Sequence, residues 1–432
     1  MKTQIYKHTL HYAICAARNV LCAAQKVFCA MMFFGITLFC TTRLSAFDFG
    51  LTLHQTLDFS GSGTESVDTA YTAGLGPWVS ATIGDNMDLY LSAFVNMKYE
   101  YNSFSGDGNW NPVLEPGLCS FIYRLPGLSL EAGRILYGDP NGLILSGLFD
   151  GASGTFGIKD TRLSLGLYYT GLLNQETAKI QMTAADMDYN YAWGEAVFSF
   201  AGRRVLATAN WEWPSIFETP HGLAVNALAQ FDVNDSDDKL HSQYLSFRFL
   251  YSPWQFLNVN AGAAFGFSQA VTTDETNQKF NVAFNLDAEW APPTPVTDLA
   301  RFGISWGSGG ENIGAFRPVT LLSPSSVLSN SIAGLVTLKG AYIIRPLENF
   351  SLRADIRYFF REKLDTFGGL TLVEDGGKKA LGGEIAGSAV WSPVSDISLT
   401  GGAAFFFPGR GNAIASGTPP QWKLSLTLAL SF

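Results

Sequence analysis

The last eleven residues of the chain alternate strictly between large apolar and small or polar side chains. The large apolar positions are Trp422, Leu424, Leu426, Leu428, Leu430 and Phe432, and Lys423, Ser425, Thr427, Ala429 and Ser431 stand between them. Because successive side chains of a β-strand point to opposite faces, this pattern places every large apolar group on one face. Such a strand must bury that face against a core or against lipid.

The same alternation recurs along the chain. It covers Asp88–Tyr101, Ser242–Tyr251, Asn281–Trp290 and Ser351–Arg361, among other segments. Strands of about ten residues with this period are typical of transmembrane barrels. After residue 46 no run of about 18 apolar residues suits a spanning helix, and only helices and closed barrels satisfy the backbone in lipid. We therefore predict an all-β fold, a single transmembrane antiparallel up-and-down β-barrel of about 18 strands, within a range of about 16 to 20.

The final strand resembles the C-terminal strand of bacterial outer-membrane proteins, which also ends on an aromatic residue. The resemblance implies that Trp422, Leu424, Leu426, Leu428, Leu430 and Phe432 form an assembly signal that the barrel-assembly machinery reads. A second segment, Asp139–Thr170, resembles uncharacterised spirochaetal outer-membrane barrels. That resemblance carries no functional residue.

The first 46 residues have the layout of an export signal. A basic stretch from Lys2 to Lys26 precedes the apolar run Val27–Cys40, and Leu44-Ser45-Ala46 supplies small residues for cleavage. We predict a signal peptide over residues 1–46 and a barrel over residues 47–432. Together they predict an integral protein of the cell outer membrane, in contact with outer-membrane lipid.

Charge and reactive residues exclude several function classes. The chain holds 37 acidic and 28 basic residues, a balance that disfavours nucleic acid as a partner. Only Cys119 of the five cysteines lies beyond residue 46, and the histidines are scattered without metal-ligand spacing. No nucleophile elbow or phosphate loop is present. We predict no enzymatic activity, no catalytic residues, no cofactor and no metal site.

The links between strands predict two unlike ends of the barrel. Short links follow an aromatic or aliphatic residue with proline, as in Tyr251-Ser252-Pro253. The predicted long polar loops are Ser103–Pro116, Asp232–Leu240, Ser268–Gln278, Gly307–Ser331, Glu362–Ala380 and Pro408–Pro420. Short periplasmic turns and long external loops are the usual asymmetry. Between residues 139 and 232 the number and direction of the strands stay open, with Tyr189–Phe200 as an expected strand and Gly154–Ile158 as an additional candidate.

The inner face carries the charged residues on which a channel depends. The pore-lining candidates are Arg353, Asp355, Arg357, Arg361, Lys98, Glu100, Asp287, Glu289 and Arg248. The longest link, Gly307–Ser331, is expected to fold inward as a constriction, with Glu311 and Arg317 facing the channel. We interpret the protein as a porin-like channel for passive diffusion of small hydrophilic solutes, because a barrel of about 16–18 strands is wide enough for water.

Two other functions stay open. The barrel could act as an outer-membrane adhesin or receptor through its external loops. It could also be a specific transporter of an apolar ligand, which predicts a lumen closed by packed aromatics such as Tyr90, Phe94 and Phe359. A homotrimer is compatible with the resemblance to general porins.

Overall fold

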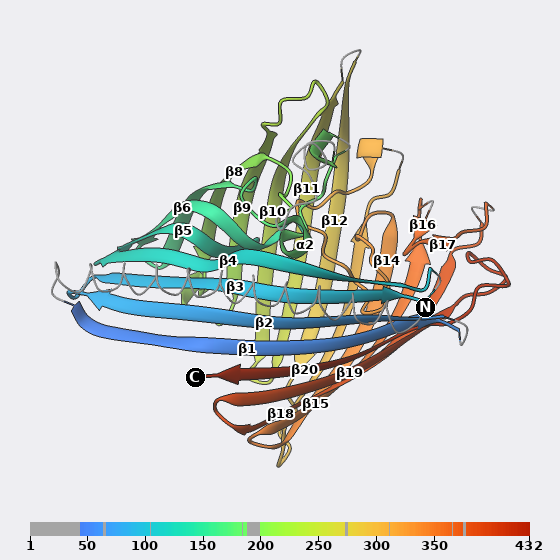
Figure 1. Ribbon diagram of the computed structural model, residues 1–432. Helices are drawn as coiled ribbons and strands as arrows, with labels where there is room; N and C mark the ends of the chain where they lie inside the picture. Colours follow the sequence, from blue (N-terminus) through green and yellow to red (C-terminus); the bar gives the residue numbers. More distant parts are fainter. Residues whose placement is uncertain are drawn as a thin grey trace.

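The computed structural model describes residues 44–432 except 64–65, 104, 184, 188–198, 273–274, 311, 365 and 375–376. Eighteen long strands make up one sheet, and a separate two-stranded hairpin lies in a link (Figure 1). The strands of the first half are β1 (Leu44–Ser62), β2 (Ser66–Ile83), β3 (Met87–Asn102), β4 (Asp107–Leu125), β5 (Leu128–Gly138), β6 (Ser146–Ile158), β7 (Thr161–Tyr169), β8 (Arg204–Trp213) and β9 (Gly222–Asp232).

The second half continues the same sheet. Its strands are β10 (Lys239–Trp254), β11 (Leu257–Val271), β12 (Thr276–Trp290), β13 (Thr297–Gly307), β14 (Leu335–Leu347), β15 (Phe350–Arg361), β18 (Ala380–Val394), β19 (Ile397–Pro408) and β20 (Gln421–Ser431), and the small hairpin is β16 (Thr366–Phe367) with β17 (Leu370–Thr371). The short helical turns are α2 (Gln175–Ala178), η1 (Ile216–Glu218) and η2 (Asn312–Gly314). None of the described helices is long and apolar enough to cross a membrane.

The sheet closes on itself. Each long strand pairs antiparallel with its neighbours in the chain, and β20 pairs with both β19 and β1. The last residue takes part, since Phe432 and Leu51 exchange two backbone hydrogen bonds of 2.9 Å. The predicted fold class and the count of eighteen strands are confirmed. β1 begins at Leu44, three residues before the predicted start of the barrel, and the position of cleavage stays a prediction.

The outer face of the barrel is apolar and exposed. Phe280 is 64% exposed and Ile356 is 61% exposed, whereas Asn281 and Asn285, which point inward from β12, are buried. A soluble protein rarely exposes such a continuous apolar surface. The alternation predicted for β10, β12 and β15 therefore puts the large apolar side chains where lipid would cover them.

The two ends of the barrel differ as predicted. At one end, which we call the short-turn end, strands are joined by links such as 84–86, 126–127 and 159–160. The chain terminus lies there, because Ser431 N–H donates to the Asp396 carbonyl in one of these turns. At the other end, the long-link end, the links 139–145, 170–203, 308–334, 362–379 and 409–420 are longer.

Two predicted long loops are wrong, and a third is close to the observed link. In place of Ser103–Pro116 and Ser268–Gln278 the structure has short links over residues 103–106 and 272–275, because the strands run further, whereas the predicted loop Asp232–Leu240 corresponds to the link 233–238. The Gly, Asn and Pro content of Ser103–Pro116 imitates a loop. In β4 the prolines Pro112 and Pro116 are tolerated because that stretch of the strand pairs with β3 alone.

Between residues 139 and 232 the structure gives the direction of the described strands. Gly154–Ile158 is the end of β6, which pairs with β5 and β7. Most of the expected strand Tyr189–Phe200 lies outside the described residues, and Phe200 forms only an isolated bridge with Asn174. β7 and β8 pair with each other in the wall.

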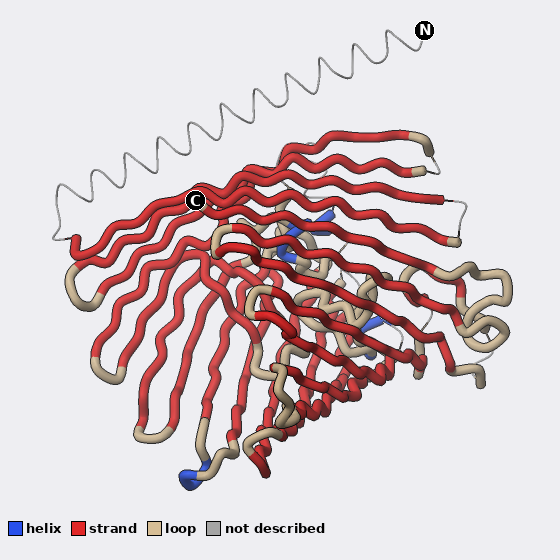
Figure 2. Tube along the Cα trace, turned by 90° about the horizontal axis from the view of Figure 1, so that it is seen from below, coloured by secondary structure: helices blue, strands red, loops and turns tan. Residues whose placement is uncertain are grey.

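The long links fold into the lumen, where Figure 2 shows loops and short helices between the strands. They form two buried apolar clusters with the wall. The first joins Leu143, Ile144, Leu145, Leu173, Ile180, Phe316, Val319 and Ile332 of the links to the inner faces of β5–β12. The second joins Leu328, Phe367, Ala413 and Ile414 to Leu335, Phe359, Leu381 and Phe406 of β14–β19. We call these clusters together the apolar layer.

Candidate functional site

A charged cavity lies on the short-turn side of the apolar layer. It has a volume of about 420 Å³ and lies against the inner face of β10–β15. Its polar lining consists of Arg248, Asn258, Asn260, Asp287, Glu289, Arg301, Lys339, Arg353, Asp355 and Arg357. Inward positions on neighbouring strands are in register, so these side chains form rows across the wall.

The first row crosses β12, β13 and β14. Asp287 pairs with Gly303, which pairs with Lys339, and the Lys339 Nζ lies 2.6 Å from the Asp287 carboxylate. A Cβ at Gly303 would collide with both side chains. The glycine therefore allows an ion pair between two strands that are not adjacent.

The second row lies one step closer to the short-turn end. Glu289 on β12 is opposite Arg301 on β13, and their charged groups are 2.9 Å apart. Both side chains are well exposed to the cavity. In such a position an ion pair contributes about 0–1 kcal/mol and exchanges readily with a solute.

The arginines of β15 differ in their surroundings. Arg353 is 41% exposed and binds Asp355 through two hydrogen bonds of 2.7 Å. Arg357 is only 16% exposed and lies 3.5 Å from Asp355. It also pairs with Glu384 on β18, whose side chain is fully buried.

Glu384 fixes the inward link 308–334. Its carboxylate accepts hydrogen bonds from the Ser325 hydroxyl and from the Ser326 N–H at 3.0 Å. Arg357 donates to the Ser326 hydroxyl at 2.6 Å. Hydrogen bonds to charged groups are roughly twice as strong as neutral ones, so this set holds the link firmly against β15 and β18.

The link 139–145 covers the other side of the cavity. Arg248 donates to the Pro140 carbonyl at 3.3 Å, and Asn141 donates to the carbonyls of Phe247 and Ala263. The buried Asp139 carboxylate accepts from the backbone N–H groups of Asn141, Leu143, Ile144 and Leu145. Burial raises the pKa of Asp139, and these four N–H groups offset part of the shift.

The link 170–203 has a buried ionic anchor of its own at the long-link end. The Arg204 guanidinium lies 2.9 Å from Asp232 and donates to Asp186 at 3.1 Å. All three side chains are almost completely buried. Burial alone would raise the pKa of Asp186, but the Arg204 charge outweighs it and holds the pKa below its ordinary value.

Six of the nine pore-lining candidates surround the cavity: Arg248, Asp287, Glu289, Arg353, Asp355 and Arg357. The other three lie elsewhere. Arg361 is buried beneath the link 362–379 and donates to the Lys378 carbonyl. Lys98 and Glu100 are on β3, where Lys98 also pairs with Glu176 of α2 at 2.9 Å.

Three charged residues at this site escaped the sequence analysis. Arg301, Lys339 and Glu384 lie at inward positions of β13, β14 and β18. The same alternation that identified Arg353 would have identified them, had each predicted strand been searched for isolated charges. Glu176 of α2, which pairs with Lys98, could not be predicted from the sequence, because a four-residue helix has no usable periodicity.

The link 308–334 does fold inward, as predicted for Gly307–Ser331. Phe316 and Val319 are buried in the apolar layer, and the Tyr244 hydroxyl donates to the Arg317 carbonyl. Arg317 is half-buried at the inner face of β10. Glu311 lies outside the described residues, so its expected position facing the channel is a prediction.

Comparison with solved structures shows which known proteins have a similar fold. No protein-family model and no curated protein matches the sequence. Three outer-membrane porins of Pseudomonas aeruginosa are similar in structure. OccK5 (OpdH) shares 11% identity and a TM-score of 0.56, with 89% of this chain and 98% of that one covered. The chain has a porin-like fold.

The other two porins agree with this. OccK2 (OpdF), solved in complex with glucuronate, shares 12% identity and a TM-score of 0.56 over 91% of this chain and 100% of its own. OpdQ shares 9% identity and a TM-score of 0.55 over 90% and 99%. At these identities the likeness concerns the fold of the porin-like barrel and none of its individual residues.

Proposed function

We propose that this porin-like barrel is an integral outer-membrane channel for passive diffusion of small hydrophilic solutes. The observation that carries the proposal is the charged cavity inside a closed barrel with an apolar outer face. Charges on a lumen wall set which ions and solutes pass. In the usual orientation of outer-membrane barrels, the short-turn end would face the periplasm and the long links would face the outside of the cell.

The cavity favours anionic solutes. Five basic and three acidic side chains line it, and its acidic groups are each paired with a base. Arg248 has no acidic partner among the described residues and binds only a backbone carbonyl. The solved complex of OccK2 with glucuronate, a carboxylate, gives a first solute class to test.

The decisive test is the conductance of the refolded chain in a planar bilayer under a salt gradient. We expect stable single-channel steps and a reversal potential that indicates anion preference. Addition of glucuronate should then reduce the current in a concentration-dependent way. A properly folded barrel that conducts no ions contradicts the proposal and favours an adhesin, a receptor or an apolar-ligand transporter.

The aromatics named for the apolar-ligand alternative do not lie together. Phe359 packs with Phe367 and Phe406 in the apolar layer. Tyr90 stacks on Trp78 and Phe94 contacts His54, both near β1–β3. This arrangement favours the hydrophilic channel over a lumen closed by one aromatic plug.

For biogenesis we propose export by the signal peptide over residues 1–46 and recognition of the last strand by the barrel-assembly machinery. The pairing of β20 with both β1 and β19 supports the second part, because the terminal strand completes the wall. Removal of Phe432 should lower the amount of assembled barrel in cells without changing its conductance. A homotrimer is tested by the mass of the detergent-solubilised protein.

A further inference from the structure

Several junctions between neighbouring strands are incomplete among the described residues, and the longest unpaired stretch lies between β4 and β5. β4 pairs with β5 only from Cys119 to Leu125, although β4 itself continues to Asp107 and pairs with β3 over that stretch. Within the described part of the chain, residues 107–118 therefore have no ladder partner on their β5 side. We call this junction the β4–β5 seam.

The sequence encodes the seam in two places. Gly133 on β5 has a φ of 119°, and a Cβ there would collide with the Cys119 carbonyl. Only glycine suits both conditions, and the β4–β5 ladder ends at the next residue, Arg134. On the other side Pro112 and Pro116 lack an N–H, which removes two donors that a neighbouring strand would otherwise have to satisfy.

On the long-link side of Arg134, the tip of the β5–β6 hairpin turns towards the lumen. Its link 139–145 lies inside the lumen, where Asn141 donates to the Phe247 and Ala263 carbonyls on β10 and β11 at 2.9 and 3.3 Å. The wall beside residues 107–118 of β4 is thus not continued by β5.

The Arg134 guanidinium bridges the seam at the end next to the β4–β5 ladder. Arg134 projects to the outer face, as do Leu130 and Leu136 at even positions of the same strand, and Leu136 is 72% exposed. Arg134 itself is only 6% exposed. It donates to the Pro116 carbonyl of β4 at 2.7 Å and to the Leu172 carbonyl at 3.0 Å, and it is bidentate to Asp150. An ionisable pair on the lipid side of a barrel is costly and is a functional candidate for that reason.

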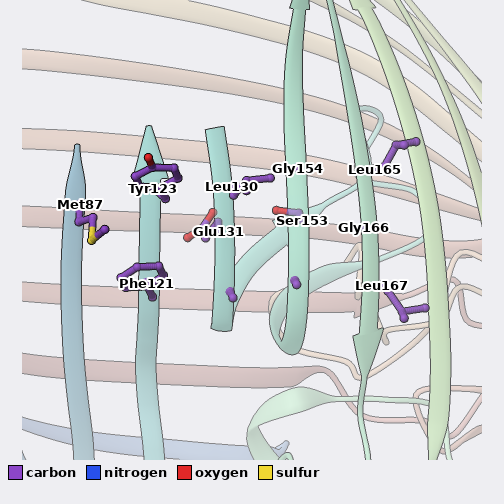
Figure 3. A pocket seen from close by; sticks show the side chains of 12 residues that line it. Met87, Phe121, Tyr123, Leu130, Glu131, Ser153, Gly154, Leu165, Gly166 and Leu167 are labelled. Atoms are coloured by element: carbon purple, nitrogen blue, oxygen red, sulfur yellow. The ribbon is translucent and has the colours of Figure 1, made fainter. Parts of the chain in front are cut away.

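An apolar groove lies directly below this pair on the same outer face. The lining residues include Phe121 and Tyr123 of β4, Leu130 and Ala132 of β5, Ala152 and Gly154 of β6, and Leu165 and Leu167 of β7. In Figure 3, Phe121 and Tyr123 lie on one side of Leu130, and Leu165 and Leu167 lie on the other. The groove has a volume of about 720 Å³. Ala132 and Ala152 are the next outward positions after Arg134 and Asp150 on their strands, so the groove begins where the seam ends.

The inner side of the seam is polar. Glu115 of β4 accepts a hydrogen bond from Thr177 of α2, and Lys98 pairs with the neighbouring Glu176 at 2.9 Å. A molecule that crosses the seam therefore moves from a polar lumen past one guanidinium into an apolar groove. That sequence of surroundings suits a molecule with a polar head and one apolar chain.

We propose that the β4–β5 seam is a lateral opening through which single-chain amphipaths pass between the lumen and the membrane, with the apolar chain in the groove. Arg134 closes the opening through its bonds to Pro116 and Leu172. This route goes beyond the axial diffusion of hydrophilic solutes and uses different residues. It does not depend on the charged cavity.

The test uses the full barrel in lipid vesicles and a long-chain fatty acid that carries a photoreactive diazirine. We expect cross-links on groove residues such as Phe121 and Leu167 and also on Glu115 or Thr177 inside the seam. Ala132→Trp should fill the groove and reduce both sets severalfold. Ala227→Trp, at an exposed outward position of β9, is the matched control and should change neither.

Cross-links confined to the outer face would overturn the proposal, because the groove would then be an ordinary lipid contact. Arg134→Gln should increase labelling inside the seam severalfold, and an unchanged level contradicts the closing role of Arg134. If this variant does not fold, the comparison of wild type with Ala132→Trp decides alone. Bilayer conductance of the same preparations tests axial diffusion separately, so failure of one proposal is distinguishable from failure of the other.

Discussion

Ion pairs occur in two regions of the lumen, and they are buried in one region and exposed in the other. At the long-link end, outside the clusters of the apolar layer, Arg204 is completely buried with Asp186 and Asp232. In the charged cavity, towards the short-turn end, Arg353 is 41% exposed beside Asp355. A buried ion pair strongly penalises loss of one partner, whereas an exposed pair contributes about 0–1 kcal/mol.

This difference separates structural charges from charges that a solute can use. Buried pairs hold the inward links and so define the width of the passage. Exposed pairs are screened by water and can exchange a partner for a passing solute. Arg357 lies between the two classes, since it borders the cavity but also holds the link 308–334 through Ser326 and Glu384.

The largest effect is expected from Arg204→Ala. It leaves the Asp186 and Asp232 carboxylates buried without their cation, which costs about 3–5 kcal/mol. The free energy of unfolding in urea, measured on the refolded barrel, checks this. Arg353→Ala is the exposed control, with an expected loss of about 1 kcal/mol or less. Equal losses in the two variants would show that the two regions do not differ in this way.

Glu384→Gln should have the next largest effect. It removes the charge that pairs with Arg357 while preserving the size of the side chain, so the link 308–334 is held less firmly. We expect a higher mean single-channel conductance and more current noise. The loss of stability should be smaller than for Arg204→Ala, because Arg357 still has Asp355 as an acidic neighbour. A current trace identical to wild type would mean that this link does not limit the passage.

Arg353→Ala should change selectivity more than stability. Loss of this exposed charge is expected to move the reversal potential towards cation preference. Arg353→Lys, which keeps the charge, should stay near the wild-type value. The prediction fails if both variants shift the reversal potential equally, since the charge at this position would then not matter.

The smallest effect concerns pH. Because the pKa of Asp186 is held below its ordinary value, its contribution to stability is fully present above about pH 4, the ordinary range of an aspartate. It is lost as the pH falls through the lower pKa of the folded state. The free energy of unfolding of wild type and of Asp186→Asn is measured from about pH 6 to about pH 3, a range that includes the ordinary pKa of an aspartate near 4. The two free energies should converge at the acidic end. Parallel curves would contradict the assignment.

The sequence by itself determined the closed barrel, its strand number and the two faces of its strands. Alternation is a local property, so Leu352, Ile356 and Arg353 show their sides of β15 without any knowledge of neighbours. For the same reason the sequence placed Arg248, Asp287 and Arg353 on the inside. The first half of β4 was predicted as a loop, because Pro112 and Pro116 have no N–H and suit a strand only where no second neighbouring strand needs a donor there.

Only the tertiary structure decided which inward charges meet and which are covered. The pair of Asp287 with Lys339 depends on the register of three strands and on the missing side chain of Gly303. The burial of Arg361 and Arg204 depends on links that enter the lumen, and the seam depends on where β5 leaves β4. These are contacts between segments far apart in the chain, and their geometry follows from closure of the whole barrel and has no local pattern in the sequence.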